Sequence, residues 1–349
     1  MYRRDTHFLI RLCLALCFLL PGTQARADNP FGLMLWPNGH QDLPFVAARA
    51  RGLGVAWFRP PAVVLDHWQK PAGCPACEAP ARAGLKVALT VRNDGRDHPP
   101  RRPSQPPSDW DAFRGTLTGV IEAWKPALLV VENEENNPQS YKAGPTPEDL
   151  AVAYGKELEQ ACAVAHAHAI ACANGGLSGD AAAGYTWLAL LQLGQTEKAC
   201  SFARKAFYTE EDRNAGAALC AYRTTASVPA DVRTALLRGA DVLIPVYARA
   251  PIDRVNIHWY GRDADAFAIV ADILVRATGK PVMSNEIGQW RWDSNPVSVR
   301  PLLRAAFASG VNPAIWYSLD TASTVSLLNE DGSLRPAGEE FVRQMSGRR

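Results

Sequence analysis

Residues 128–137 have the sequence LLVVENEENN, in which four apolar residues are followed directly by carboxylates and amides. The stretch PVMSNEIG at residues 281–288 has the same form. Near-continuous apolar runs of this length are typical of parallel strands that are buried on both faces of a sheet. Each stretch therefore predicts a buried parallel strand with polar side chains at its carboxyl end.

Working outward from these two segments, similar apolar runs recur along the chain with helical patterns between them. Eight strands are predicted, at residues 31–36, 55–59, 86–91, 128–133, 171–174, 254–259, 281–285 and 314–318. Eight strands that alternate with helices predict a (β/α)₈ barrel. The alternative is an open doubly wound sheet, which is disfavoured because no G-x-G-x-x-G motif follows any of the strands.

Helix ends are signalled at several positions between the strands. Ser108 and Thr146 are candidate N-caps, each with an aspartate three residues later, and Gly279 is a candidate C-cap. The stretch from 176 to 250 is long for one connection and contains helical patterns. We expect it to form a helical insertion between the fifth and sixth strands.

Composition places the chain among globular proteins with a sizeable core. It has 349 residues, of which 47% are hydrophobic and 21% charged, and its formal net charge is +2. This small charge disfavours a protein dedicated to binding nucleic acid, because such proteins carry strongly basic surfaces.

The first 27 residues have the pattern of a secretory signal peptide. A basic start at Arg3, Arg4 and Arg11 precedes the apolar run 12–20, and Ala25-Arg26-Ala27 fits a cleavage site. The alternative is a membrane anchor, which the short apolar run disfavours. We expect residues 28–349 to form a single barrel domain, secreted or periplasmic, monomeric, and without stable membrane insertion after signal cleavage.

Six cysteines remain after such cleavage, and an even number in an exported chain favours disulfides. The sequence-local pairing is Cys74–Cys77, Cys162–Cys172 and Cys200–Cys220, one of 15 possible pairings. The C-P-A-C stretch at 74–77 also fits a redox or zinc motif, but no second pair with ligand spacing follows it. We expect a structural disulfide there.

The polar residues at the strand ends suggest the chemistry. In a (β/α)₈ barrel, reactive groups lie at the carboxyl ends of the strands, where Glu134 and Glu286 are expected. Two carboxylates that face each other suit glycosidic cleavage, one as proton donor and the other as nucleophile or base. Retaining enzymes hold the two groups about 5–5.5 Å apart, and inverting enzymes about 6.5–9.5 Å.

The chain resembles the clan A glycoside hydrolases, a superfamily of retaining (β/α)₈ enzymes. These enzymes carry Asn-Glu after the fourth strand and Glu after the seventh, matched here by Asn133-Glu134 and Glu286. The further matches are an arginine after the second strand, His-x-Tyr after the sixth and a tryptophan on the eighth. They correspond to Arg59, to His258 with Tyr260, and to Trp316.

The resemblance implies a role for each matched residue. Glu134 is expected to be the general acid and then the base, Glu286 the nucleophile, and Asn133 the residue that holds the sugar 2-hydroxyl. Arg59 and Tyr260 would keep Glu286 charged, while His258 and Trp316 would line the site. Strand alternation puts Glu132 on the same face as Glu134, so Glu132 is a second candidate for the acid.

Tryptophans at or after the expected strand ends are candidate sugar-stacking residues, because the flat ring packs against the C–H face of a sugar. They are Trp36, Trp259, Trp290, Trp292 and Trp316. No cofactor or metal is expected, and the substrate is expected to be an oligo- or polysaccharide. The alternatives are a barrel that binds glycan without cutting it and a metal-dependent hydrolase on the same fold.

Overall fold

The computed structural model describes residues 29–35, 43–69, 73–94, 103–207, 214–261, 263–289, 295–320 and 326–346. The expected signal peptide at residues 1–27 lies outside these ranges, as do Trp36, Trp290 and Trp292.

All eight expected strands form, and each pairs in parallel with its neighbours. In chain order they are β1 (Phe31–Leu35), β2 (Trp57–Arg59), β4 (Lys86–Arg92), β5 (Leu128–Val131), β6 (Ala171–Asn174), β7 (Val255–Trp259), β8 (Val282–Ile287) and β9 (Ala314–Asp320). A two-residue strand, β3 (Val63–Val64), pairs with the carboxyl end of β4. The fourth expected strand is shorter than predicted, since β5 ends at Val131 and not at residue 133.

The strands form a nearly closed barrel. Their order is β6-β5-β4-β2-β1-β9-β8-β7, so the first and last strands of the chain are neighbours. Between β6 and β7, isolated parallel bridges join Ala173 to Arg254 and Leu177 to Ile257. The amide of His258 also donates to the carbonyl of Leu177 at 2.9 Å. This arrangement is a (β/α)₈ barrel and excludes the open doubly wound sheet.

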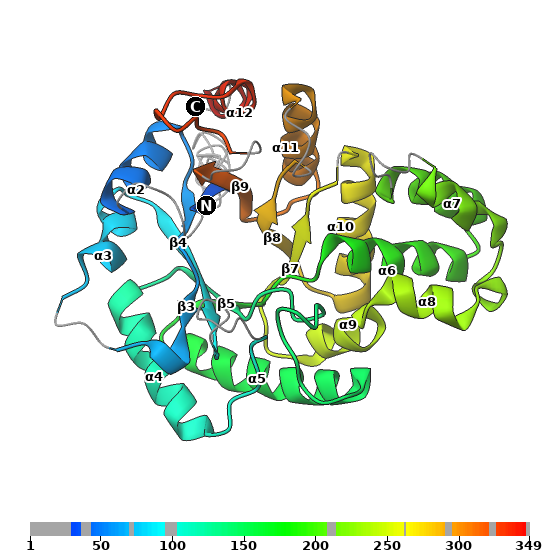
Figure 1. The fold of residues 1–349 in the computed structure, drawn as a ribbon, viewed down its shortest axis with the longest axis horizontal. Helices are drawn as coiled ribbons and strands as arrows, with labels where there is room; N and C mark the ends of the chain where they lie inside the picture. Colours follow the sequence, from blue (N-terminus) through cyan, green and yellow to red (C-terminus); the bar gives the residue numbers. More distant parts are fainter. Residues whose placement is uncertain are drawn as a thin grey trace, which may run out of the picture.

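Helices cover the outside of the barrel (Figure 1). Seven of them are α2 (Leu43–Gly52), α3 (Pro75–Arg82), α4 (Trp110–Trp124), α5 (Pro147–Ala167), α10 (Ala264–Thr278), α11 (Val299–Ala308) and α12 (Pro336–Ser346). Among the residues that the structure describes, no helix is both long and apolar enough to cross a bilayer.

The sequence signals place the helix ends to within one residue. Thr146 and Asp149 form the expected capping box at the start of α5, and Gly279 ends α10 with a left-handed φ of 71°. The expected cap at Ser108 is wrong by one position. Asp109 caps α4, because its Oδ1 accepts from the amides of Asp111 and Ala112 at 2.9 and 3.0 Å.

The connection between β6 and β7 is helical in its described residues and extends to the right of the barrel in Figure 1. It contains α6 (Gly179–Gln192), α7 (Thr196–Ala206), η2 (Ala215–Ala221), η3 (Thr225–Ser227), α8 (Ala230–Leu237) and α9 (Ala240–Arg249). That this segment is an insertion relative to other barrels stays a prediction.

The six cysteines described by the structure form the three sequence-local pairs that the sequence predicts. Cys74–Cys77 lies at the start of α3, Cys162–Cys172 joins α5 to β6, and Cys200–Cys220 joins α7 to η2.

The core has two parts, separated by the wall of the barrel. The larger part lies between the strands and the helices. The smaller part fills the barrel interior with Met34, Ala88, Leu128, Val130, Ala173, Met283 and Ile315. Thr90, Asn174, Asn256 and Asn285 are also fully buried. All four lie on barrel strands, and their hydrogen bonds connect to the candidate active site.

Candidate active site

Glu286 lies on β8, enclosed by groups that favour its charged form. Its Oε1 lies 2.5 Å from Nη1 of Arg59, which ends β2, and its Oε2 accepts a hydrogen bond from the hydroxyl of Tyr260. The Glu286 side chain is only 10% exposed. A carboxylate so buried is stable as an ion only when it is paired and hydrogen-bonded.

These partners set the charge state of Glu286. Burial alone would raise the pKa of Glu286, but the imidazole of His258, the guanidinium of Arg59 and the hydrogen bond from Tyr260 lower it below its ordinary value of 4.5. Glu286 is therefore ionised at neutral pH. A buried, ionised carboxylate at the end of a barrel strand is chemically suited to attack an electrophilic carbon.

Glu134 follows β5 in a tight, strained turn. Its φ is 47° and that of Glu132 is 71°, values that residues other than glycine rarely adopt. The amide of Asn137 donates to the carbonyl of Glu134 at 2.8 Å, and Asn137 Nδ2 donates to Glu134 Oε2 at 3.2 Å. These bonds hold the carboxylate at the end of the barrel, with 23% of the side chain exposed. Such backbone strain is commonly found at functional sites.

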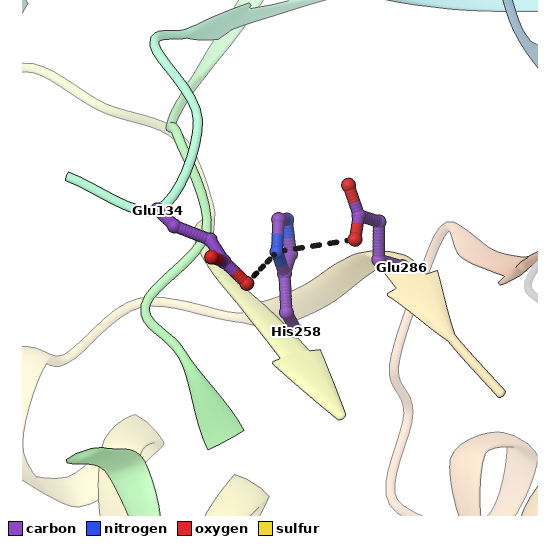
Figure 2. A group of neighbouring side chains, drawn as sticks. All are labelled: Glu134, His258 and Glu286. Atoms are coloured by element: carbon purple, nitrogen blue, oxygen red, sulfur yellow. Dashed lines mark hydrogen bonds and ion pairs between the residues drawn. The ribbon is translucent and has the colours of Figure 1, made fainter. Parts of the chain in front are cut away.

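His258 lies between the two glutamates and comes from β7 (Figure 2). Its Nδ1 is 3.2 Å from Glu134 Oε1 and 3.4 Å from Glu286 Oε2. One carboxylate oxygen of each glutamate and a ring nitrogen of His258 lie within 4.8 Å of one another. The structure therefore brings together three of the residues that the sequence singled out, from β7, β8 and the turn after β5.

The other side of the His258 ring faces an amide oxygen. Its Nε2 lies 2.9 Å from Oδ1 of Asn285, which also accepts from Nδ2 of Asn256 at 2.7 Å. Nε2 must therefore carry a proton. Burial lowers the pKa of His258, but the carboxylates of Glu286 and Glu134 outweigh burial and raise it above 6.5. A His258 ring protonated on both nitrogens donates toward the two carboxylates. The His258 ring packs directly against Gly176, where a Cβ would lie 2.1 Å from Nε2. A glycine at position 176 therefore leaves room for the ring.

Asn133 is tied to the same group of residues. Its Oδ1 accepts from Arg59 Nη2 at 2.9 Å, while Arg59 Nε donates to Thr90 Oγ1 at 3.0 Å. Arg59 thus holds Asn133 and Glu286 at once. Of the seven predicted site residues, the structure brings six together: Arg59, Asn133, Glu134, His258, Tyr260 and Glu286.

Trp316 is the exception, and the prediction that it contacts substrate needs correction. Its side chain is fully buried on the outer side of β9, where it packs against Phe341 of α12 at 5.9 Å between ring centroids. Its neighbour Tyr317 faces the interior instead, with its ring 5.3 Å from that of Tyr260. Alternation along the strand explains the difference, since adjacent residues point to opposite faces.

Glu132 does not share a face with Glu134, so the alternation argument for it is wrong. β5 ends at Val131, and the positive φ of Glu132 turns the chain. The Glu132 carboxylate accepts from the amide of Asn93 and from Ser104 Oγ, both at 2.7 Å. It lies among these groups and Arg92, away from the trio of Glu134, His258 and Glu286.

Sequence reasoning missed the buried polar residues that support the site. These residues are Asn174, Asn256 and Thr90, and they hydrogen-bond to each other or to residues of the site. Each is uncharged and lies within a strand, so none has the signal of a carboxylate that directly follows a strand. Their signal is a polar side chain inside an otherwise apolar strand, as in Val255-Asn256-Ile257.

The spacing of Glu134, His258 and Glu286 also suits a cation. The hydrogen bonds argue against that use. Arg59 and Tyr260 already donate to the two oxygens of Glu286, which leaves these oxygens less available to a metal. The donor set therefore fits proton sharing better than metal binding.

A cavity of about 1310 Å³ opens beside Glu134. Tyr260 lines its near end, and residues of α6 and α8 line its far wall. A cavity of this size beside Glu134 is large enough for an extended ligand.

Comparison with solved structures finds the same fold in several glycoside hydrolases. The endo-β-1,4-mannanase of Thermotoga petrophila superposes with a TM-score of 0.56 at 11% sequence identity, over 92% of this chain and 77% of that one. The chain shares the (β/α)₈ fold of glycoside hydrolases. A family 39 glycoside hydrolase of Bacteroides cellulosilyticus is also similar, with a TM-score of 0.52 at 14% identity. The superposition covers 91% of this chain and 64% of that one.

A Thermomonospora fusca β-mannanase, solved with mannohexaose, is also similar (TM-score 0.50, 13% identity, 90% of this chain and 88% of that one). At such low identity these similarities establish the fold alone, and any inference about chemistry depends on the residues of the site. No protein-family model matches the chain, and no curated protein matches it by sequence.

Proposed function

We propose that this protein is a clan A glycoside hydrolase that cleaves β-linked glycans with retention of anomeric configuration. The observation that carries the proposal is the approach of Glu134 and Glu286, whose nearest carboxylate oxygens lie within 4.8 Å at the end of the barrel. Retaining glycosidases hold their carboxyl groups about 5–5.5 Å apart, which is too close for the water molecule of an inverting mechanism.

The first step forms a glycosyl-enzyme ester. Glu286 attacks the anomeric carbon, the bond from that carbon to the glycosidic oxygen breaks, and Glu134 transfers its proton to the departing oxygen. In the second step Glu134 takes a proton from water, the resulting hydroxide attacks the same carbon, and Glu286 leaves as a carboxylate. Two inversions give net retention.

The surrounding residues assist both steps. Arg59 and Tyr260 stabilise the charge of Glu286 before attack and after release. His258 lies between the two carboxyl groups, with Nδ1 3.2 Å from Glu134 Oε1 and 3.4 Å from Glu286 Oε2, and orients both. Asn133, which accepts a hydrogen bond from Arg59, would bind the sugar 2-hydroxyl, as the resemblance implies.

The names of the structural neighbours suggest which glycans to test first. Two of the similar structures are β-mannanases, one of them bound to mannohexaose. We therefore place β-mannan beside β-glucan, galactan and xylan in the first substrate panel. The partner is an oligo- or polysaccharide, and no metal or cofactor takes part in the proposed steps.

The proposal includes export. The three disulfides of the described chain favour an oxidising compartment, and residues 1–27 have the pattern of a signal peptide. We infer a secreted or periplasmic, monomeric protein with one catalytic domain at residues 28–349. Cleavage after Ala27 would be checked by N-terminal sequencing of the exported protein.

The decisive experiment compares the wild-type protein with Glu286→Gln and Glu134→Gln on that panel. We expect Glu286→Gln to abolish turnover on every glycan, since a neutral amide is a poor nucleophile. NMR of the first product should show the β-anomer. Glu159→Gln, on an exposed face of α5, is the matched control and should keep full activity.

Two alternatives predict different results. A barrel that only binds glycan would retain saccharides without turning over any of them. A metal-dependent hydrolase would lose activity in strong chelator, whereas we expect unchanged rates. Initial formation of the α-anomer would contradict retention.

A further inference from the structure

The cavity beside Glu134 lies on one side of the catalytic pair. Its described lining includes Glu134 and Tyr260 but neither Glu286 nor Arg59. It continues over most of residues 134–147 in the connection from β5 to α5. The cavity thus begins at the proposed proton donor and extends away from the nucleophile.

The stereochemistry of displacement relates this direction to the substrate. The nucleophile and the leaving oxygen lie on opposite sides of the anomeric carbon, and the acid must contact the leaving oxygen. Space that adjoins Glu134, and not Glu286, therefore receives the part of the glycan that departs first. In a β-linked chain this is the part that carries the reducing end.

The far wall of the cavity comes from the helices between β6 and β7. Thr234 and Ala235 on α8 line it, and an ion pair between Asp180 of α6 and Arg238 at the end of α8 spans the wall at 3.3 Å. Phe207, half-buried at the end of α7, adds an aromatic surface. Flat aromatic side chains of this kind stack on the apolar faces of sugar rings.

The size of the cavity exceeds what one sugar ring needs. Pockets of about 300–1,000 Å³ enclose most of a drug-sized ligand, and this one measures about 1310 Å³. A site for one small leaving group would not require the loop 134–147 and two further helices around it.

On the basis of the proposed function, we propose that this cavity binds two or more sugar residues on the leaving-group side of the scissile bond. The enzyme is then an endo-acting hydrolase, and the helical segment between β6 and β7 determines how many sugars are released with the reducing end. Ala235 on α8 and Gln139 in the connection from β5 to α5 both line the cavity and are exposed, and they are specificity-determining positions.

The test narrows the cavity and follows which bond is cut. The substrate is a hexasaccharide of the glycan that wild-type protein hydrolyses, labelled at its reducing end, and its partner is the same glycone with a nitrophenyl leaving group. We expect Ala235→Trp to lower kcat/KM for the hexasaccharide by about tenfold, because remote binding energy supports catalysis. The labelled products should become shorter.

The nitrophenyl substrate fills only the near end of the cavity, so its hydrolysis should be unchanged. Gln139→Trp narrows the cavity from the connection between β5 and α5 and should act in the same direction. Leu193→Trp is the control, since Leu193 is exposed at the end of α6 and does not line the cavity. Circular dichroism and Tm establish that each variant is folded.

The outcomes separate this proposal from the proposed function. If both cavity variants cut the hexasaccharide at the wild-type bonds and rates, the cavity does not bind the leaving group, although the enzyme remains a glycosidase. Equal losses on both substrates would also overturn the proposal. No turnover of any glycan by wild-type protein would overturn both.

Discussion

Glu132, Glu134 and Glu135 lie within four residues of one another and occupy three different environments. Glu134 faces His258, whereas Glu135 is buried and accepts from Tyr247 and from Asn174 Nδ2. Positive φ angles at Glu132 and Glu134 send the side chains in these directions. At the scale of the residue, the backbone decides which of the three glutamates faces His258.

The charge of Glu286 depends on Arg59, and this dependence predicts a pH effect. Because Arg59 lowers the pKa of Glu286, its removal in Arg59→Leu should raise that pKa. The acid limb of the kcat/KM profile should then move to higher pH, by about one unit or more. Tyr260→Phe should move the limb in the same direction by less, since it removes one hydrogen bond and no charge.

The measurement is kcat/KM against pH on a soluble oligosaccharide. Arg276→Leu, which removes an exposed arginine from α10, serves as the control and should leave the limb in place. An unchanged acid limb in Arg59→Leu would show that Glu286 is not the ionised group on which catalysis depends.

Glu132 predicts a pH dependence of stability. Burial raises the pKa of Glu132 from 4.5 to about 7, although Arg92 and hydrogen bonds from Asn93 and Ser104 oppose it. The folded protein therefore binds more protons than the unfolded chain between these values. The contribution of Glu132 to the free energy of unfolding is therefore fully present below pH 4.5, and it is lost as the pH rises through about 7.

Glu132→Gln should remove this part of the pH dependence, because an amide cannot ionise and its oxygen still accepts the same hydrogen bonds. Thermal unfolding of wild type and variant across this range checks it, with Glu159→Gln as the exposed control on α5. If the curves of Tm against pH for Glu132→Gln and wild type are parallel, Glu132 does not contribute to the pH dependence of stability.

At the scale of the element, three asparagines join the strands that carry the site. Asn174 of β6 accepts from the amide of Asn256 on β7 at 2.6 Å, and Asn256 Nδ2 donates to Asn285 Oδ1 on β8 at 2.7 Å. Asn256 Oδ1 also accepts from the amide of Asn285 at 3.0 Å. These side chains connect β6, β7 and β8 where backbone pairing between β6 and β7 is reduced to isolated bridges.

Asn256→Leu should therefore destabilise the protein strongly. It leaves the amide of Asn285 and the carbonyl of Asn174 with fewer partners, at a cost of about 1–3 kcal/mol for each buried group that stays unpaired. Met283→Leu, an apolar exchange in the same interior, should cost less than about 1.5 kcal/mol. Urea unfolding measures both, and equal losses would show that the asparagine contributes no more than packing.

At the scale of the whole molecule, the disulfides stabilise the fold mainly by lowering the conformational entropy of the unfolded chain. Their cysteines are separated by 3, 10 and 20 residues. In the chain-entropy account, the longest loop restricts the unfolded chain most. Replacing Cys200 and Cys220 by alanine should thus lower the free energy of unfolding by about 2–4 kcal/mol, and replacing Cys74 and Cys77 should lower it by less.

Chemical unfolding of the two double variants and wild type, all under oxidising conditions, tests this order. The Cys74–Cys77 variant is the internal control, since the shortest loop is closed at the start of α3. Equal losses in the two variants would mean that folded-state contacts, and not chain entropy, set the contribution.

Much of the molecule was predictable because its signals are local. The eight strands, the (β/α)₈ barrel, the capping box at Thr146 and the three neighbouring cysteine pairs each depend on residues close in sequence. Six of the seven predicted site residues also lie together, because the barrel places the ends of all parallel strands on one face. Their catalytic and binding roles stay predictions.

The errors occurred where a single backbone angle or strand face decides the result. The sequence predicts that Trp316 contacts substrate, but alternation turns its side chain toward Phe341 and brings Tyr317 inward. Strand alternation predicts that Glu132 and Glu134 share a face, but β5 ends at Val131, before either residue. Neither the strand end nor the face can be read from the residue types alone.

By itself, the sequence determined that this chain forms a barrel of parallel strands with carboxylates at their carboxyl ends, because apolar runs and turn residues act within a few positions of each other. Three further features follow from the folded chain alone: which carboxyl groups come together, the position of His258 between them, and the opening of the cavity beside Glu134. These features depend on contacts between segments that are distant in sequence, such as Glu134 after β5 and His258 on β7, which lie 124 positions apart. Barrel closure and packing set the geometry of these contacts.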